Sequence, residues 1–343
     1  MLNVDFTQLK TSIEGASRVV LCCHKSPDGD ALSSMIAWAM FLDGVLSTNE
    51  NREITMVAPD AFPDFLRWLP SIEKVVRYDK HKEEVEKKFA EADLIFCLDF
   101  NVSSRVGEMQ ETLDKAQGRK VMIDHHLNPV MENALIISEP ESSSTAELVF
   151  RLIEGLGGAD QIDKKCASVI YCGMMTDTGG FVYNSNRAVI YEIISKLMKK
   201  GINKDKIYRN VYNNYSQWAI RLRGYVLCHK MNVFPDCHAS YFTISKQDMQ
   251  NFHFMKGDAE GLVNEPLRIK GMRLSISLRE DDRHENVVWV SLRSVDDLRC
   301  DLLASRFFNG GGHANASGGR LNCSLEEAEQ VARKAIESLK ETK

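Results

Sequence analysis

Aspartate and histidine residues at four places in this sequence have the types and spacing of divalent-cation ligands. They are His24, Asp28 and Asp30 around a Pro-Asp-Gly turn, Asp99 at the end of LIFCLD, Asp124-His125-His126 at the end of VMID, and Asp177 in MMTDTGGF. Each alone has an ordinary explanation as a surface turn, a helix cap or solvated histidines. Gathered at one point, however, several carboxylates would repel one another unless cations neutralised them.

The donor types indicate which ions and which chemistry. Oxygen and imidazole ligands without thiolate suit Mn²⁺, Mg²⁺ or Fe²⁺, and the histidines favour Mn²⁺. Two such ions ~3.5–4 Å apart activate water and stabilise the oxygens around an in-line displacement at phosphorus. The residues therefore predict phosphoester or phosphoanhydride hydrolysis with two divalent cations.

The N-terminal elements explain how these residues could meet. Apolar runs at 18–24, 54–58, 93–99 and 120–124 alternate with helical patterns at 31–42, 82–90 and 106–117. This alternation predicts an α/β fold with a mostly parallel sheet flanked by helices on both faces. His24, Asp99 and Asp124 each come where a strand ends, and in such sheets ligands bind at the carboxyl ends of the strands.

The rest of the chain predicts a second unit. Helical spacing continues at 144–154, 165–175, 186–199, 204–213 and 217–230, followed by strands at 238–245, 271–278 and 286–293 and a helix at 325–339. We predict a catalytic domain at 1–200, a helical linker at 201–230 and a smaller α/β domain at 231–343, with an active-site cleft between the domains.

A glycine-rich stretch in this second unit suggests a phosphate-binding segment. The residues GGGHANASGG span 310–319, and backbone N–H groups at Gly311 and Gly312 could form an anion-binding nest to which His313 adds a hydrogen bond. The spacing of its glycines matches neither the Walker phosphate-binding motif nor the dinucleotide-binding motif. Arg293, at the end of an upstream strand, could hold a phosphate bidentately. The plain alternatives are a flexible turn for the glycine-rich stretch and a solvated surface charge for Arg293.

Composition limits the partners. The 343 residues carry 43 Lys and Arg against 48 Asp and Glu, a net charge of −5, which argues against an electrostatic grip on long duplex nucleic acid. No apolar run approaches the ~20 residues of a membrane span, and no signal-peptide pattern is evident. Nine cysteines without a C-x-x-C pair suggest reduced core thiols. We expect a cytoplasmic protein.

Taken together, the motifs resemble those of the DHH phosphoesterase superfamily, named for the sequence seen here at 124–126, and the glycine-rich stretch resembles its DHH-associated C-terminal domain. The resemblance covers nearly the whole chain. Within the superfamily, GLVNEPLRIKG, SLRS and FNGGGH are most similar to the bacterial nanoRNase/pAp phosphatases.

The resemblance implies a role for each residue. One metal would be held by His24, Asp28 and Asp99 and the other by Asp30, Asp99, His125 and Asp177, with Asp99 as the bridge. His126 would face the scissile phosphate, and Asp124 would orient His125. The substrate-binding residues would be Arg293, Gly311, Gly312, His313 and Ser317.

The implied activity is Mn²⁺-dependent degradation of short oligoribonucleotides to mononucleotides, with dephosphorylation of 3′-phosphoadenosine 5′-phosphate (pAp) to AMP. Alternatives that share the metal site are a phosphodiesterase for cyclic or linear signalling dinucleotides, a single-strand exonuclease and an exopolyphosphatase. A different class would be a nucleotide sensor without turnover, which the complete ligand set disfavours. The partners expected are thus small nucleotides and not membranes, and a homodimer is left open.

Overall fold

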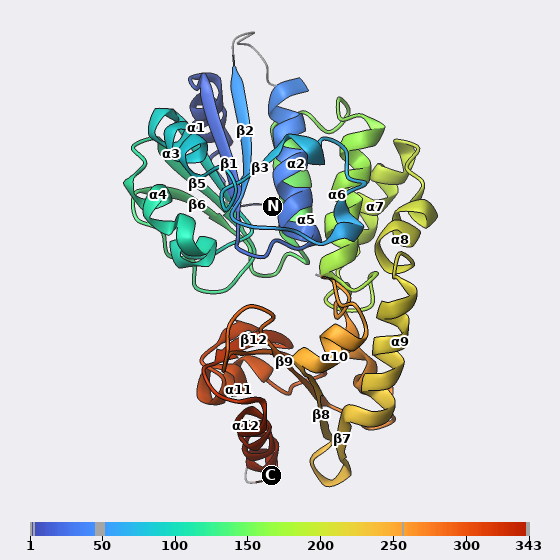
Figure 1. Cartoon of the computed structure of the whole chain (residues 1–343). Helices are drawn as coiled ribbons and strands as arrows, with labels where there is room; N and C mark the ends of the chain where they lie inside the picture. The colour runs from blue at the N-terminus through green and yellow to red at the C-terminus, as the bar shows by residue number, and fades with distance from the viewer. Residues whose placement is uncertain (1, 3, 45–51, 256, 341–343) are drawn as a thin grey trace. The chain divides into compact units, whose positions relative to one another are not determined.

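The computed structural model of the chain describes residues 2, 4–44, 52–255 and 257–340 (Figure 1). It divides into two compact units, Met1–Asn214 and Tyr215–Lys343, here called the N-terminal and C-terminal units. The division falls inside the stretch 201–230 predicted as a linker. Helix α8 (Lys204–Tyr212) packs against α6 (Lys164–Asp177) in the N-terminal unit, whereas α9 (Gln217–Tyr225) belongs to the C-terminal unit. The helices of this stretch therefore belong to the two units rather than to a linker of their own.

The N-terminal unit is built on a parallel sheet, as predicted. Its order in the described residues is β3-β2-β1-β4-β5-β6, and every neighbouring pair is parallel. The strands are β1 (Arg18–Cys23), β2 (Glu53–Ala58), β3 (Val75–Arg77), β4 (Leu94–Leu98), β5 (Arg119–Asp124) and β6 (Ala134–Ser138). The chain runs outward in one direction from β1 and in the other from β4, so β1 and β4 form the topological switch point at which such sheets bind ligands.

Helices cover both faces of this sheet, because the central strands are apolar on both sides. Val19 and Leu21 of β1 face a core shared with α2 (Gly29–Gly44), α5 (Thr145–Gly155), α6 and α7 (Ala188–Lys199). Val20 and Cys22 face α3 (Lys82–Glu91) and α4 (Gln110–Lys115) on the other side. The short helix α1 (Phe6–Glu14) adds Leu9 and Ile13 to the first core.

Two local predictions need correction. The expected helix at 106–117 is a 3-10 helix, Ser103–Met109, followed by α4, because Gly107 takes a φ of 61° and interrupts the helical backbone. The strands β3 and β6 were not anticipated. Both lie at the sheet edges, where a strand pairs on one side only, and β3 has just three residues.

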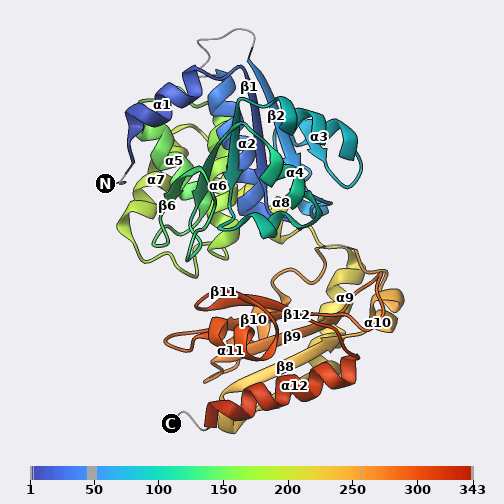
Figure 2. The same ribbon diagram turned by 90° about the vertical axis from the view of Figure 1, so that its left-hand side faces the viewer.

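Among its described residues, the C-terminal unit has a mixed sheet of order β11-β12-β10-β9-β8-β7, in which only β8 and β9 pair in parallel. The strands are β7 (Met231–Phe234), β8 (Ala239–Ile244), β9 (Leu274–Glu280), β10 (Val288–Ser294), β11 (Gly311–His313) and β12 (Ala316–Leu321). Helices α11 (Cys300–Phe307) and α12 (Leu325–Glu337) pack on one face, with α12 along β8 and β9 (Figure 2). A short helix, α10 (Lys246–Asn251), follows β8, and a 3-10 helix, Leu262–Arg268, packs against β9 and β10.

Most cysteines are core residues, as predicted from the sequence. Seven are buried, Cys323 is partly buried and Cys228 is exposed, and none is in a disulfide. In the described part of the chain, no helix is both long and apolar enough to cross a membrane.

Candidate active site

The strands of the N-terminal unit bring the predicted ligands to one edge of the sheet. His24 directly follows β1, Asp99 follows β4, and Asp124 is the last residue of β5. Because β1, β4 and β5 are neighbours in the sheet, these side chains gather at the switch point. Asp99 has a left-handed backbone with φ of 65°, and its N–H donates to Ile123 O at 3.0 Å, which fixes the turn by which the chain leaves β4.

Two further predicted ligands come from helix ends rather than strand ends. Asp30 lies in the first turn of α2, and Asp177 is the last residue of α6. A Cβ atom at Gly29 would overlap the side chain of Thr176, so glycine at this position allows the end of α6 to approach the start of α2. Tight helix packing thus carries Asp177 to the sheet edge.

The first group of possible ligands consists of His24, Asp28 and Asp99. The Nε2 atom of His24 lies 3.8 Å from Asp28 Oδ2 and 3.5 Å from Asp99 Oδ2, and one donor atom from each residue lies within 4.8 Å of the others. His24 Nδ1 lies 2.8 Å from Lys25 O. In the neutral ring, a proton on Nδ1 satisfies this carbonyl and puts the lone pair on Nε2, as a metal ligand requires.

The second group consists of Asp30, His125 and Asp177. His125 Nε2 lies 3.9 Å from Asp30 Oδ2 and 3.6 Å from Asp177 Oδ2, again with all donors within 4.8 Å. It also lies 3.7 Å from Asp99 Oδ1. Because Asp99 Oδ2 faces the first group and Oδ1 faces the second, Asp99 has the geometry of a shared ligand.

The crowding of the carboxylates is visible in their pKa values. Burial, reinforced by the neighbouring carboxylates, raises the pKa of Asp30 well above its usual value. Burial likewise raises the pKa of Asp177 to about 6, although the nearby imidazole of His125 opposes this shift. Burial of Asp99 acts in the same direction, but the surrounding imidazoles outweigh it and hold its pKa far below the usual range.

The pKa values of the His24 and His125 imidazoles are raised by the neighbouring carboxylates and not by burial. Burial by itself lowers the pKa of His24, but its contacts with Asp99 and Asp28 outweigh burial and raise that pKa. Burial also opposes protonation of His125, and the charges of Asp177 and Asp99 raise its pKa overall. Both shifts favour the protonated imidazole, because carboxylates crowd around each ring and attract positive charge.

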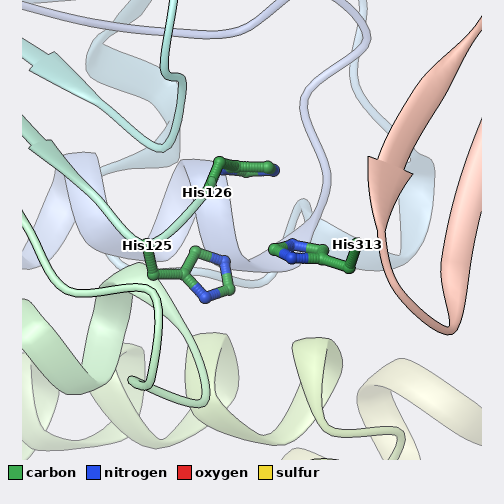
Figure 3. A group of neighbouring side chains, drawn as sticks. All are labelled: His125, His126 and His313. Carbon is green, nitrogen blue, oxygen red and sulfur yellow. The ribbon is translucent and has the colours of Figure 1, made fainter. Parts of the chain in front are cut away.

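His126 and Asp124 form a hydrogen-bonded pair beside Asp99, whose Oδ1 lies 3.9 Å from His126 Nδ1. His126 Nδ1 lies 2.7 Å from Asp124 Oδ1, and the backbone N–H of His126 donates to Asp124 Oδ2 at 3.1 Å. The rings of His125 and His126 are inclined at 69° (Figure 3), and His125 Nδ1 instead faces Ser142 O at 3.1 Å. Asp124, which we predicted to orient His125, thus has hydrogen bonds with His126, while its charge also acts on His125. The side chain of an aspartate readily bonds the backbone two residues later, and that local turn selects His126.

The substrate-binding candidates of the C-terminal unit lie on adjacent strands. Arg293 of β10 pairs with Ala316 of β12, and β12 pairs with β11, which carries Gly311, Gly312 and His313. The hydroxyl of Ser317 donates to His313 O at 2.8 Å within this hairpin. The structure thus brings these predicted residues together inside one unit (His313 is labelled in Figure 3).

The glycines in this stretch differ in how much space a side chain would have. A Cβ atom at Gly310 would overlap the carbonyl of Gly318, whereas a Cβ atom at Gly311 meets nothing within 4 Å. The glycine-rich stretch is therefore a tightly packed hairpin and not a flexible turn, and Gly311 is its glycine with open space around it.

One polar segment was missed by the sequence reasoning. Ser142, Ser143, Ser144 and Thr145 are all fully buried, although serine-rich stretches usually indicate surface loops. Glu147, one turn into α5, is also fully buried and accepts the backbone N–H of Ser143 at 2.7 Å. The available signal was the capping pattern Ser-x-x-Glu before an apolar helix, which predicts a helix start but not its burial.

Comparison with known proteins gives matches over nearly the whole chain. Residues 18–174 match the model for the DHH family, N-terminal domain. The chain is 46% identical to an exopolyphosphatase-related protein from Bacteroides fragilis, whose crystal structure superposes with a TM-score of 0.90, covering 98% of this chain and 96% of that one.

Curated relatives are more distant. The bifunctional oligoribonuclease and PAP phosphatase NrnA of Bacillus subtilis is 25% identical over 328 residues, which are 95% of this chain and 96% of that protein. The cyclic-di-AMP phosphodiesterase PdeA of Listeria monocytogenes is 23% identical over 339 residues, which are 96% of this chain but 49% of that protein.

Proposed function

Since this chain belongs to the DHH family, we propose that it is a metal-dependent phosphoesterase that hydrolyses short oligoribonucleotides to mononucleotides and pAp to AMP. The observation that carries this proposal is the position of the buried Asp99, which presents one carboxylate oxygen to each of two groups of candidate ligands. A pair of divalent cations is the arrangement that such a shared carboxylate serves.

The donor set fits two such ions. His24, Asp28 and Asp99 would hold one, and Asp30, Asp99, His125 and Asp177 the other. All are oxygen or imidazole donors, a set that suits Mn²⁺ and also admits Mg²⁺ or Fe²⁺. When bound, the ions would supply Lewis-acid activation of water and of the phosphoryl oxygens.

His126 would act on the substrate rather than on the cations. With the Nδ1 proton held by Asp124, the Nε2 atom presents its lone pair, or a proton when the ring is charged, to a phosphoryl or leaving oxygen. The His126 side chain is 15% exposed, whereas Asp124 is fully buried. That difference suits a residue that meets substrate and a partner that only orients it.

The C-terminal unit would recognise the end of the substrate. Arg293 supplies a cationic fork for a phosphate, and the hairpin with Gly311, Gly312, His313 and Ser317 supplies backbone and imidazole donors. Recognition of an end restricts cleavage to mononucleotide units. The segment 265–320 carries nine basic and eight acidic residues, which favours short substrates over a long single strand held along a basic groove.

Product analysis tests the proposal. The full chain with Mn²⁺ is incubated in parallel with a 5′-phosphorylated RNA dinucleotide, pAp, cyclic di-AMP, a single-stranded DNA of about 20 nucleotides, and pyrophosphate. We expect mononucleotides from the RNA, AMP from pAp and little product from the DNA. Consumption of pyrophosphate alone would contradict the substrate assignment.

Two variants connect activity to the site. Asp99→Ala should lose both ions and all turnover, because it removes the shared ligand. Asp64→Asn is the matched control, since Asp64 is exposed and contacts Arg67 on the surface. Retained turnover with normal metal content in Asp99→Ala would refute the assignment of the site.

A second candidate is a cyclic-dinucleotide phosphodiesterase. It is favoured by the match to the Listeria protein, which extends along nearly all of this chain while covering about half of that one. Hydrolysis of cyclic di-AMP with no release of AMP from pAp would select this candidate.

A further inference from the structure

The buried polar segment before α5 contacts the ligands of both groups. Ser142 O faces His125 Nδ1 at 3.1 Å, and Thr145 contacts both Asp30 and Asp99. Because buried polar groups are normally hydrogen-bonded, the burial of this segment requires partners, and it finds several of them in the candidate ligands.

The first turn of α5 holds Asp30. The backbone N–H of Thr145 donates to Asp30 Oδ2 at 2.7 Å, and that of Ala146 donates to Asp30 Oδ1 at 2.9 Å. These N–H groups belong to the start of an eleven-residue helix, where the helix itself leaves them without acceptors. Both oxygens of Asp30 are therefore fixed by the backbone, independently of side-chain identity at 145.

The hydroxyl of Thr145 acts on the other ligand. Its Oγ1 donates to Asp99 Oδ1 at 2.7 Å, and both residues are buried. Asp99 Oδ1 is the oxygen that faces His125, while Oδ2 faces His24. The Thr145 hydroxyl, by donating to one oxygen of Asp99, fixes the rotation of that carboxylate. The rotation determines whether each of the two ligand groups has an Asp99 oxygen facing it.

We propose that Thr145 is a positioning residue whose hydroxyl holds the Asp99 carboxylate in the orientation that serves both ligand groups. This inference rests on the proposed metal-dependent function, since it assigns Thr145 a role in shaping the cation site. Because Thr145 is fully buried, it would act through Asp99 and not on the substrate itself. Partners of this kind commonly change metal affinity or activity by about 10- to 100-fold when removed.

The test compares Thr145→Val, which keeps the shape and removes the hydroxyl, with Thr145→Ser, which keeps the hydroxyl. Calorimetric titration of the chelator-treated full chain with Mn²⁺ gives the number and affinity of bound ions. Steady-state kinetics on the RNA dinucleotide give kcat and KM, and circular dichroism checks the fold. Should Thr145→Val fail to fold, Thr145→Ala takes its place.

We expect Thr145→Val to lose about 10- to 100-fold in Mn²⁺ affinity or in kcat with little change in KM, and Thr145→Ser to remain within a few-fold of the wild type. Wild-type ion binding and kcat in Thr145→Val would overturn the proposal. Equal losses in both variants would also overturn it, because the hydroxyl would not be the cause.

The outcome is separable from the substrate assignment. If the wild type binds Mn²⁺ but hydrolyses none of the nucleotides, the proposed function falls, while the difference in ion binding between the two variants still decides the role of Thr145. If the wild type binds no divalent ion, the positioning role falls with the site.

Discussion

Replacement of Asp124 by asparagine should impair catalysis while leaving the cation ligands in place. Asp124 is fully buried and accepts two hydrogen bonds from His126, one from the ring and one from the backbone. An asparagine can accept only through its carbonyl oxygen, so its amide group must face one of these two donors. The imidazole then rotates away or changes tautomer, and Nε2 no longer presents the same lone pair.

The size of the effect follows from the hydrogen bond that is lost. A hydrogen bond to a charged group contributes about 1.5–3 kcal/mol. Because about 1.4 kcal/mol corresponds to a factor of ten in rate, kcat should fall about 10- to 150-fold. KM and Mn²⁺ stoichiometry should stay close to those of the wild type, since neither ligand group includes Asp124 as proposed.

A double-mutant comparison gives the decisive measurement. The kcat of Asp124→Asn is measured on the RNA dinucleotide in the wild-type background and again in a His126→Gln background. If Asp124 acts through His126, the second substitution should add almost nothing to the first. An undiminished effect of Asp124→Asn in the absence of His126, or a loss confined to metal affinity, would refute the reasoning.

The remaining predictions concern protons and packing. Because the pKa values of His24 and His125 are raised, their imidazolium forms persist above the pH of about 6.5 at which a free imidazole loses its proton. Mn²⁺ must displace these protons, so the affinity for Mn²⁺ should increase as the pH rises through about 6.5 and upward. Titration calorimetry in two buffers of different ionisation enthalpy should reveal this proton release. A Mn²⁺ affinity that stays the same between pH 6 and pH 8 would contradict the prediction. In the C-terminal hairpin, Gly310→Ala should destabilise the unit by about 1–3 kcal/mol because the new methyl group overlaps the Gly318 carbonyl, whereas Gly311→Ala should leave stability nearly unchanged. Urea unfolding of both variants measures the difference, and equal midpoints would show that the hairpin adjusts freely.

The sequence was informative where a local pattern determines position. An apolar run that ends in a charged residue marks both a parallel strand and its carboxyl end, so the location of His24 and Asp99 at one sheet edge could be predicted from the order of residue types alone. Asp177 was also predicted as a ligand from its place where an apolar helix ends, but its approach to the sheet edge depends on the packing of Gly29 against Thr176, which no periodicity encodes.

Other features depend on tertiary contacts that a linear pattern does not contain. Asp124 bonds the ring of His126 and not that of His125, because the chain turns over these residues so that the second histidine faces the aspartate. The burial of Ser142 to Thr145 arises because α5 starts against the ligands, although the residues themselves are typical of a solvent-exposed loop. Gly107 similarly divides a stretch whose apolar spacing is helical throughout.

The strand order also has a consequence for how the protein acquires its site during folding. The central pairing of β1 with β4 joins Val19 to Leu94, and the ligand set is complete only when Asp177 is in place. Such distant pairings form slowly, because a long loop must close before any contact rewards it. The unfolded chain therefore holds no preformed ion site, and a divalent cation held by these residues would bind the native state selectively. At about 100 times its dissociation constant, one such ion would stabilise the fold by about 2.7 kcal/mol, so the supply of metal would govern the lifetime of the protein as well as its chemistry.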